Sequence, residues 1–373
     1  MRLDKLEIEG FRSLKSTTWT PGDLNVIIGA NGSGKSNLLR LLHMLSASAK
    51  ADLDKFVRNS GGMAPLLWVG GAKSVDVKLD AKGVNDLEDE FAFMYRLLLE
   101  SWSNRQRVGL EQLLASNTAF SDAFSEQLRM ERANAKDAET RLSLEAQFDP
   151  HGLAGLFGQY LAKWGIYHDI RTDRASEIRQ DPIVRHEMEL ESDASNLIPV
   201  IHTLYTNYPN FREEFDKSMA VAFDFEYEKV DFAPSVNQRI QMRVHWKSLK
   251  NPMPASELSD GTLRFMFLMT ALCHPEPPPL IVIDEPETGL NGDMFALVAE
   301  SAAIMAKKSQ VVFTTHAPEF LSAMQEFEPT VTYCTMEHGE TAFKNVDRET
   351  LGEWLKDYSL GDLYLSRELE IIA

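Results

Sequence analysis

The sequence has few cysteines, no long hydrophobic run and few basic side chains. Only Cys273 and Cys334 are cysteines, so a single chain has neither a disulfide framework nor a C-x-x-C metal site. The N-terminus lacks the apolar segment of a signal peptide, and the two features together predict a cytoplasmic location. The most apolar run, residues 265–273, is far shorter than the ~20 residues of a membrane span. We therefore expect no membrane partner.

The shortage of basic residues limits the partners further. Asp and Glu number 56 against 38 Lys and Arg, which gives a formal net charge of −18. Phosphate groups are bound by clustered lysine and arginine, so this charge disfavours non-specific adhesion to nucleic acid or anionic lipid. It remains compatible with a local basic groove. The 373 residues suffice for one large domain or two ordinary domains.

One motif stands out against this ordinary composition. Residues 29–36, GANGSGKS, match the phosphate-binding pattern G-x-x-x-x-G-K-[ST]. The apolar run 24–28 predicts a buried strand before it, and residues 36–45 predict a helix after it. In such a loop, backbone N–H groups surround phosphates, Lys35 contacts the β- and γ-phosphates, and the Ser36 hydroxyl ligates Mg²⁺. We expect a nucleoside triphosphate site here rather than a glycine-rich turn without a ligand.

A second motif, residues 280–285 (LIVIDE), is typical of a buried strand that ends in two carboxylates. Open α/β sheets bind ligands at this end of their strands. Asp284 is placed to hold Mg²⁺ directly or through water, and Glu285 to act as the general base that polarises the attacking water. The pair indicates hydrolysis. The alternative is that the two acids only cap the next helix.

Two further segments carry candidate groups. The apolar run 310–315 predicts a strand that ends at His316, which either contacts the γ-phosphate or is a structural histidine. Residues 257–264 (ELSDGTLR) open an apolar helix. The turn from Ser259 to Gly261 at the N-terminus of this helix is either an anion site or a plain N-cap.

In this order, the motifs resemble those of ABC-type ATPases of the SMC/RecF-like branch, in particular stand-alone bacterial AAA-type ATPases that are OLD-like but lack a Toprim domain. The positions that carry the resemblance are residues 8–13 (first strand and turn), 29–36 (Walker A), 258–261 (signature motif), Asp284 and Glu285 (Walker B), 288–291 (D-loop) and His316 (switch histidine), with segments 167–170 and 353–365. Two positions depart from the family pattern. Asp260 replaces the second glycine of the signature, and the D-loop ends in Asn291 rather than Asp or His. Gln147 and Gln180 are the candidates for the Q-loop residue.

The resemblance implies ATP and Mg²⁺ as ligands and a defined set of site residues. Nucleotide contacts are expected from Arg12, Asn31, Gly32, Ser33, Gly34, Lys35, Ser36, Asn37, Ser259 and Gly261. The implied metal ligands are Ser36 and Asp284, and the implied catalytic residues are Glu285 and His316.

The resemblance also implies a composite site between two heads. Heads of this family meet head to tail, so that Ser259 of one head would cap the γ-phosphate on the Walker A motif of the other. ATP holds such a dimer together, and hydrolysis at Glu285 releases it. Because one chain carries one motif set, we expect an ATP-dependent homodimer or a pairing with a homologous chain.

For the fold we expect an α/β P-loop NTPase of the ABC-ATPase type, with a mixed sheet core, an antiparallel β lobe and a helical insertion. Residues 1–83 and 220–373 are predicted to form the nucleotide-binding head, and residues 84–219 a mostly helical insertion. The prediction of helices starts at Leu87 and depends on the spacing of Phe91, Tyr95, Leu98 and Leu99.

Shorter patterns add local predictions. Period-two alternation predicts strands at 74–79, 222–227 and 239–244, and helical spacing predicts a helix at 211–219. The charge-rich residues 130–144 lack sustained apolar heptads, which argues against a long coiled coil.

Two functions of different kinds fit these motifs. The first is an ATPase switch or motor in DNA metabolism or antiphage defence, acting on DNA or through a separate effector such as a nuclease, because the chain ends too soon after the ATPase motifs for a Toprim domain. The alternative is a nucleotide-gated scaffold that sequesters an effector with little turnover, which Asp260 and the acidic charge favour. Loss of Glu285 separates them, since a scaffold survives it. A transporter subunit, a small-molecule kinase and a GTPase fit less well, because residues 10–13 match the SMC/RecF-like branch and no Asn-Lys-x-Asp motif is present.

Overall fold

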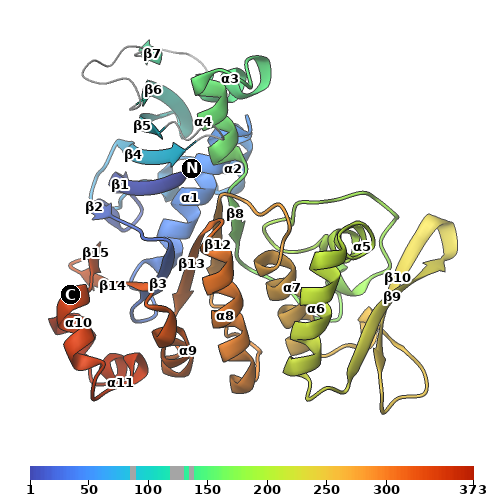
Figure 1. Cartoon of the computed structure of the whole chain (residues 1–373). Helices are drawn as coiled ribbons and strands as arrows, with labels where there is room; N and C mark the ends of the chain where they lie inside the picture. Colours follow the sequence, from blue (N-terminus) through green and yellow to red (C-terminus); the bar gives the residue numbers. More distant parts are fainter. Residues whose placement is uncertain (85–89, 118–129, 134–137) are drawn as a thin grey trace. The chain divides into compact units, whose positions relative to one another are not determined.

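The computed structural model describes residues 1–84, 90–117, 130–133 and 138–373 (Figure 1). The chain forms two compact units, and each unit combines segments that lie far apart in the sequence. The first unit comprises Met1–Trp164, Thr330–Trp354 and Glu368–Ala373. The second unit comprises Gly165–Pro329 and Leu355–Arg367. The phosphate-binding loop therefore belongs to the first unit, and the paired acids belong to the second.

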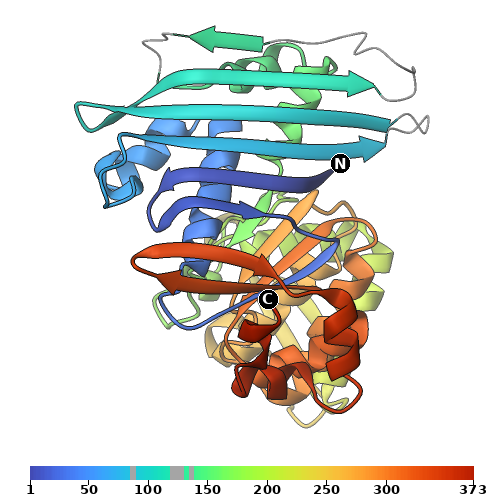
Figure 2. The same ribbon diagram turned by 90° about the vertical axis from the view of Figure 1, so that its left-hand side faces the viewer.

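The first unit contains a six-stranded antiparallel sheet, which Figure 2 shows face-on with the helices behind it. Its strands lie in the order β2 (Leu14–Trp19), β1 (Arg2–Phe11), β4 (Ser74–Val84), β5 (Glu90–Trp102), β6 (Arg105–Asn117) and β7 (Met130–Ala133). One face is covered by the helices α1 (Lys35–Ala49), α2 (Leu53–Asn59), α3 (Arg141–Phe148) and α4 (Leu153–Ala162). The strand predicted at 74–79 is confirmed as part of β4.

The helical prediction that starts at Leu87 is wrong for β5 and β6. Along β5 the buried side chains are Phe93, Tyr95, Leu97 and Leu99, which alternate with more exposed neighbours in the period of a strand. A two-residue turn joins the strands at Ser103 and Asn104, which both have positive φ, as hairpin turns require. The predicted insertion also includes residues 85–89, 118–129 and 134–137, which lie outside the described residues. Its boundaries at 84 and 219 stay a prediction.

An aromatic cluster and a buried carboxylate connect α4 and α3 to the sheet. Phe157 of α4 lies 5.3 Å from the ring of Phe93 and 5.4 Å from that of Tyr95. Glu111 of β6 is completely buried and accepts hydrogen bonds from the Tyr95 hydroxyl (3.0 Å) and from the backbone N–H groups of Arg141 (2.6 Å) and Leu142 (3.0 Å). An acid at a helix N-terminus satisfies the first N–H groups of the helix, so Glu111 anchors α3.

The first unit also holds the strand that leads into the phosphate-binding loop. The predicted strand at 24–28 is confirmed as β3 (Leu24–Ile28), and all five of its residues are buried. It pairs in parallel with β14 (Thr330–Glu337), which pairs antiparallel with β15 (Glu340–Asn345). The short helices α10 (Arg348–Trp354) and α12 (Glu368–Ile371) follow these strands.

The core of the second unit is parallel, in the order β13 (Gln310–Thr315), β12 (Leu280–Asp284) and β8 (Gly165–Tyr167). β12 and β13 are buried along nearly their whole length, as parallel strands covered on both faces are, and they confirm both predicted strands. The helices of this core are α7 (Asp260–Leu272), α8 (Phe295–Met305), α9 (Pro318–Met324) and α11 (Leu360–Leu365) (Figure 1).

The rest of the second unit combines helices α5 (Leu197–Asn207) and α6 (Pro209–Ala222) with a small antiparallel sheet. Its strands lie in the order β11 (Met253–Pro254), β10 (Arg239–Trp246) and β9 (Tyr227–Ser235). The helix predicted at 211–219 and the strand at 239–244 are confirmed. The strand predicted at 222–227 is wrong, because Asp224 and Phe225 have positive φ and β9 begins only at Tyr227. Among the residues that the structure describes, no helix has the length and apolar character to cross a membrane.

Candidate functional site

The loop between β3 and α1 has the conformation of a phosphate-binding loop. Gly34 is the N-cap of α1 and has φ 109°, a backbone dihedral that residues other than glycine rarely adopt. A Cβ atom there would lie 2.1 Å from Thr341 Oγ1 of β15, so packing also requires glycine. Gly32 has φ 81°, but a Cβ atom on it would meet no described atom within 4 Å. The loop is therefore packed on the side of Gly34 and open at Gly32.

The groups that could meet a phosphate lie in this loop and at the start of α1. Lys35 is only 6% exposed, and its Nζ donates to Gly29 O (2.7 Å) and Ala30 O (3.2 Å). Ser33 is 4% exposed, and its Oγ has no hydrogen-bond partner among the residues that the structure describes. Asn31 and Ser36 are exposed. A buried ammonium beside an unsatisfied hydroxyl fits an anionic ligand.

A second group of side chains joins the loop to β1 and β15. Arg12 Nη1 donates to Asn37 Oδ1 (3.3 Å), and Asn37 Nδ2 donates to Ser13 Oγ (2.6 Å). Thr341 Oγ1 lies 2.7 Å from Ser13 Oγ and 2.8 Å from Ser33 O. Thr341 is not predictable from the sequence, because nothing in the residues around it indicates that β15 lies against the loop.

Arg12 lacks a complete set of partners. Its Nε is buried and makes no hydrogen bond with any described residue. Burial lowers the pKa of the guanidinium below its ordinary value, and the positive charge of Arg40 lowers it further. A cation held near another cation with an unpaired donor is suited to a phosphate oxygen.

The paired acids follow β12 in the second unit. The Thr314 hydroxyl of β13 donates to Asp284 Oδ1, and the backbone N–H of Glu285 donates to Thr314 O (3.1 Å). Glu285 has φ 46°, a left-handed conformation that is uncommon for a residue other than glycine. The next helical element, a 3-10 turn at Gly292–Met294, has Asn291 as its N-cap, so the two acids do not cap a helix.

His316 lies beside two carboxylates at the end of β13. Its Nδ1 is 3.1 Å from Glu285 Oε1 and 3.8 Å from Glu287 Oε1. Glu287 is 8% exposed, and its Oε1 accepts hydrogen bonds from the Thr315 hydroxyl (2.6 Å) and from the backbone N–H of His316 (3.4 Å). Its Oε2 is buried and has no partner in the described part of the chain.

The environment of Glu287 also affects its ionisation. Burial raises the pKa of its carboxyl group above the ordinary value. Glu287 is not among the predicted site residues, although it stands two residues after the Walker B glutamate. A buried acid that contacts a histidine is an arrangement that orients the imidazole ring.

The predicted signature motif opens α7. Ser259 is the N-cap of this helix, and its Oγ accepts a hydrogen bond from Thr262 N (3.0 Å). A Cβ atom on Gly261 would lie 2.5 Å from Gly289 O in the predicted D-loop, so glycine lets these two segments touch. Asp260 is 63% exposed and pairs with Arg179 Nη2 at 2.5 Å. Asn291 donates from Nδ2 to Asp293 Oδ2 (3.3 Å).

The structure thus collects the predicted site residues into three groups. Arg12, Asn37 and the residues of the loop lie together in the first unit. In the second unit, Glu285 and His316 are in contact, Asp284 is linked to them through Thr314, and Ser259 and Gly261 lie at the start of α7. Of the Q-loop candidates, Gln180 donates from Nε2 to Ala175 O (3.2 Å), and Gln147 is exposed on α3.

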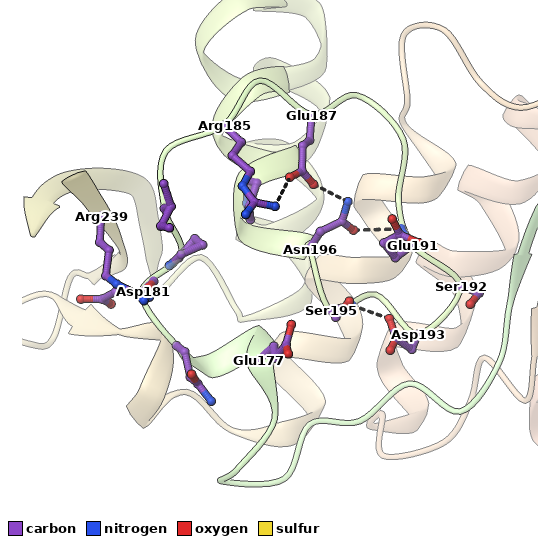
Figure 3. A pocket seen from close by; sticks show the side chains of 14 residues that line it. Glu177, Asp181, Arg185, Glu187, Glu191, Ser192, Asp193, Ser195, Asn196 and Arg239 are labelled. Atoms are coloured by element: carbon purple, nitrogen blue, oxygen red, sulfur yellow. Dashed lines mark hydrogen bonds and ion pairs between the residues drawn. The ribbon is translucent and has the colours of Figure 1, made fainter. Parts of the chain in front are cut away.

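The second unit also contains a polar hollow of about 530 Å³ (Figure 3). Five carboxylates and two guanidinium groups line it: Glu177, Asp181, Glu187, Glu191 and Asp193, with Arg185 and Arg239. Several of its polar groups bond to one another, as when Asn196 Nδ2 donates to Glu187 Oε2 (2.6 Å) and Ser195 N donates to Asp193 Oδ1 (3.0 Å). An excess of carboxylates repels a polyphosphate, so this hollow is not the nucleotide site.

Two family models match the sequence. "AAA ATPase domain" matches residues 1–151, and "AAA domain, putative AbiEii toxin, Type IV TA system" matches residues 164–322. A comparison with curated proteins gives no match.

The fold is similar to that of SMC head domains. An Smc head bound to the C-winged helix domain of ScpA is 18% identical with a TM-score of 0.56, over 95% of this chain and 100% of that chain. The Smc head of Pyrococcus furiosus, with an extended coiled coil and bound to the C-terminal domain of ScpA, is 15% identical with a TM-score of 0.56, over 95% and 98%. The Smc head of Pyrococcus yayanosii is 12% identical with a TM-score of 0.51, over 95% and 99%.

The regions matched by the two family models meet near Trp164, where the first unit ends and the second begins. Each match contains one half of the expected motif set, since the loop at 29–36 falls in the first and the acids at 284–285 fall in the second. The predicted α/β fold of a P-loop ATPase is confirmed. Both family models that match the chain describe AAA-type ATPase domains, and the fold of the chain is that of SMC head domains.

Proposed function

We propose that this ATPase domain binds ATP with Mg²⁺ at the loop of residues 29–36, hydrolyses it, and uses ATP to hold two heads together as a switch on a separate effector. The observation that carries the proposal is the state of the loop. The Lys35 ammonium, Ser33 Oγ and Arg12 Nε are all buried. Neither of the last two atoms has a hydrogen-bond partner within the described ranges. Buried polar atoms are rarely left unsatisfied, and phosphate oxygens would satisfy both of these donors.

The candidate residues of the first unit have different parts in the proposed binding. Lys35 exchanges its two carbonyl acceptors for phosphate oxygens, while Arg12, fixed by Asn37, adds a second positive charge. The open space at Gly32 lets the backbone approach the ligand closely. Ser36 is the candidate in this unit for a ligand of Mg²⁺, and Asp284 is the candidate in the second unit. The metal would supply a Lewis acid that stabilises negative charge on the phosphates.

The proposed hydrolytic machinery lies in the second unit. Glu285 accepts a proton from the attacking water, and His316, 3.1 Å from its carboxylate, orients it and contacts the γ-phosphate. Glu287 holds His316 from the buried side. A strained backbone at a catalytic residue is a common way to fix its direction, which supports this role for Glu285 at φ 46°.

The proposed dimer is head to tail. Ser259 is exposed at the N-terminus of α7, where the helix dipole attracts an anion. We infer that this end of α7 meets the γ-phosphate on the loop of a second copy. Contact between Gly261 and Gly289 O would transmit the presence of that phosphate to the segment after the Walker B acids.

The proposed partner is a separate effector protein, with a nuclease as one class. Two names support a partner chain without identifying it: one family model carries the description of a toxin of a toxin–antitoxin system, and two similar Smc heads are bound to ScpA. DNA stays a candidate partner, in DNA metabolism or antiphage defence. A net charge of −18 confines direct DNA contact to a local basic surface.

A nucleotide-gated scaffold with little turnover is the second candidate. Asp260, an acid in the signature, favours it, because an acid beside a phosphate weakens the composite site. The pairing of Asp260 with Arg179 reduces this argument, and the contact between Glu285 and His316 favours hydrolysis.

The test combines nucleotide binding with release of inorganic phosphate. Glu285→Gln should bind ATP as tightly as the wild type and lose on the order of 100-fold in turnover, as removal of a general base does. Lys35→Ala should lose binding itself. Equal turnover in wild type and Glu285→Gln would contradict the hydrolytic role. If an identified effector is still released by Glu285→Gln in an ATP-dependent manner, the scaffold is the better description.

A further inference from the structure

Arg179 is a buried arginine that the motifs of the ATPase family do not explain. It ends a 3-10 turn, η2 (Glu177–Arg179), and its side chain is only 8% exposed. Its guanidinium contacts two separate segments of the second unit. Nε donates to Thr172 O (2.6 Å), while the terminal nitrogens reach the loop that precedes α7.

This one side chain donates several hydrogen bonds to that loop. Nη1 of Arg179 donates to the carbonyl oxygens of Leu258 (2.6 Å) and Ser256 (3.3 Å) and lies 3.5 Å from that of Ala255. Nη2 donates to Asp260 Oδ1 (2.5 Å). The contacts surround Ser259, the N-cap of α7, on both sides in the sequence. A planar guanidinium satisfies several acceptors in a fixed geometry, which a lysine ammonium on a flexible stem does not.

The contact with Asp260 has an electrostatic consequence. Asp260 stands in the first turn of α7, next to Ser259, and its side chain is 63% exposed. Without a partner, this carboxylate would repel any phosphate that approached the N-terminus of the helix. Arg179 brings an opposite charge to one of its oxygens.

We propose that Arg179 is a positioning residue of the composite site: it holds residues 255–260 in the conformation that presents Ser259, and it cancels the charge of Asp260 so that a phosphate bound by a second copy can approach. The inference rests on the proposed head-to-tail dimer. It explains how this chain carries an acid where the family has glycine, since the acid and the buried arginine act as one neutral unit.

The test measures dimer formation in a background that cannot hydrolyse ATP. In Glu285→Gln with saturating ATP and Mg²⁺, a dilution series in the analytical ultracentrifuge gives the dissociation constant of the dimer. Arg179→Gln leaves the Asp260 charge uncompensated and is expected to raise that constant by about tenfold or more. Asp260→Asn removes the charge and should change it by less than about threefold. The double variant Arg179→Gln/Asp260→Asn should recover at least about threefold relative to Arg179→Gln, because the repulsion is gone.

A matched control comes from the same segment. Arg185 is 64% exposed and lies 3.8 Å from Glu187, so Arg185→Gln removes the same charge without touching the loop and should leave the dimer unchanged. The binding of a fluorescent ATP analogue at concentrations below dimerisation should be equal in all variants, since Lys35 belongs to the other unit. Arg179→Lys keeps the positive charge but loses the planar guanidinium with its several donors. Its dimer dissociation constant should lie between those of the parent and Arg179→Gln, and it replaces Arg179→Gln as the test if that variant does not fold.

The outcomes separate this inference from the proposed function. If the Glu285→Gln parent stays monomeric with ATP, the dimer and the role of Arg179 are both wrong. If the parent dimerises and Arg179→Gln, or folded Arg179→Lys, has the same dissociation constant, the role of Arg179 alone is overturned. If the double variant shows no recovery, the charge-cancelling part of the inference is overturned.

Discussion

Gly34→Ala is the substitution whose cost the structure lets us work out in most detail. At φ 109°, an alanine is strained by about 1–2 kcal/mol relative to glycine. Its Cβ would lie 2.1 Å from Thr341 Oγ1 and 2.8 Å from Thr341 Cγ2, and forced overpacking of this kind costs about 1–3 kcal/mol. Together, about 2–5 kcal/mol destabilise the observed conformation of the loop, which is the conformation proposed to bind a phosphate. The variant relieves this strain by leaving that conformation, and ATP must then restore it.

The expected result is a loss of ATP affinity of at least about 30-fold, which corresponds to about 2 kcal/mol. Isothermal titration calorimetry with ATP and Mg²⁺ measures it, and a thermal melt measures the accompanying loss of stability. Gly32→Ala is the matched control, because Gly32 has φ 81° but open space around its Cβ position, so only the smaller strain cost applies. Equal affinity in Gly34→Ala and the wild type would refute the assignment of this loop as the phosphate site.

Three further predictions follow from single contacts. Arg12→Gln should weaken ATP binding roughly tenfold (about 1.4 kcal/mol), because it removes a donor to the phosphate. It should not lower the melting temperature, because it also removes a buried Nε that no described group satisfies. Calorimetry and melting curves check this, and unchanged affinity would contradict it. Burial raises the pKa of Glu287 above 4.5, so the unfolded state loses this proton first and the free energy of unfolding should fall as pH rises from 4.5 through the folded-state pKa. Glu287→Gln should lack this decrease in melts from about pH 4 to about pH 8, and parallel curves for the two proteins would count against the pKa shift. His316→Ala should lower kcat for phosphate release by more than about tenfold with little change in KM, because the histidine orients Glu285 and its contact with the γ-phosphate counts mainly in the transition state. A change confined to KM would argue against that role.

The elements around the two main motifs could be predicted from the sequence because local patterns determine them. β3, α1, β12 and β13 combine apolar runs with a glycine, an acid or a histidine at their ends, and all four are where the pattern indicates. The prediction for residues 90–117 failed because Phe91, Tyr95 and Leu98 also match a helical period, while pairing with β4 and with each other decides for strands.

The side chains that support the site were less accessible to sequence reasoning. Thr341 lies more than three hundred residues after the loop that it contacts, and Arg179 lies 81 residues before Asp260. Neither residue stands in a motif, so only the tertiary structure shows the contact. Glu287 had a weak local signal, as a third acid near the end of β12, but its burial and its contact with His316 depend on the packing of β12 against β13.

The central claim is that ATP holds two copies of this chain together. The most direct measurement is the molar mass of purified Glu285→Gln by light scattering, with and without ATP and Mg²⁺, beside Lys35→Ala under the same conditions. We expect a mass that rises from one chain to two only when Glu285→Gln has both ATP and Mg²⁺, and that stays at one chain in Lys35→Ala. A mass that ATP leaves unchanged in Glu285→Gln would contradict it.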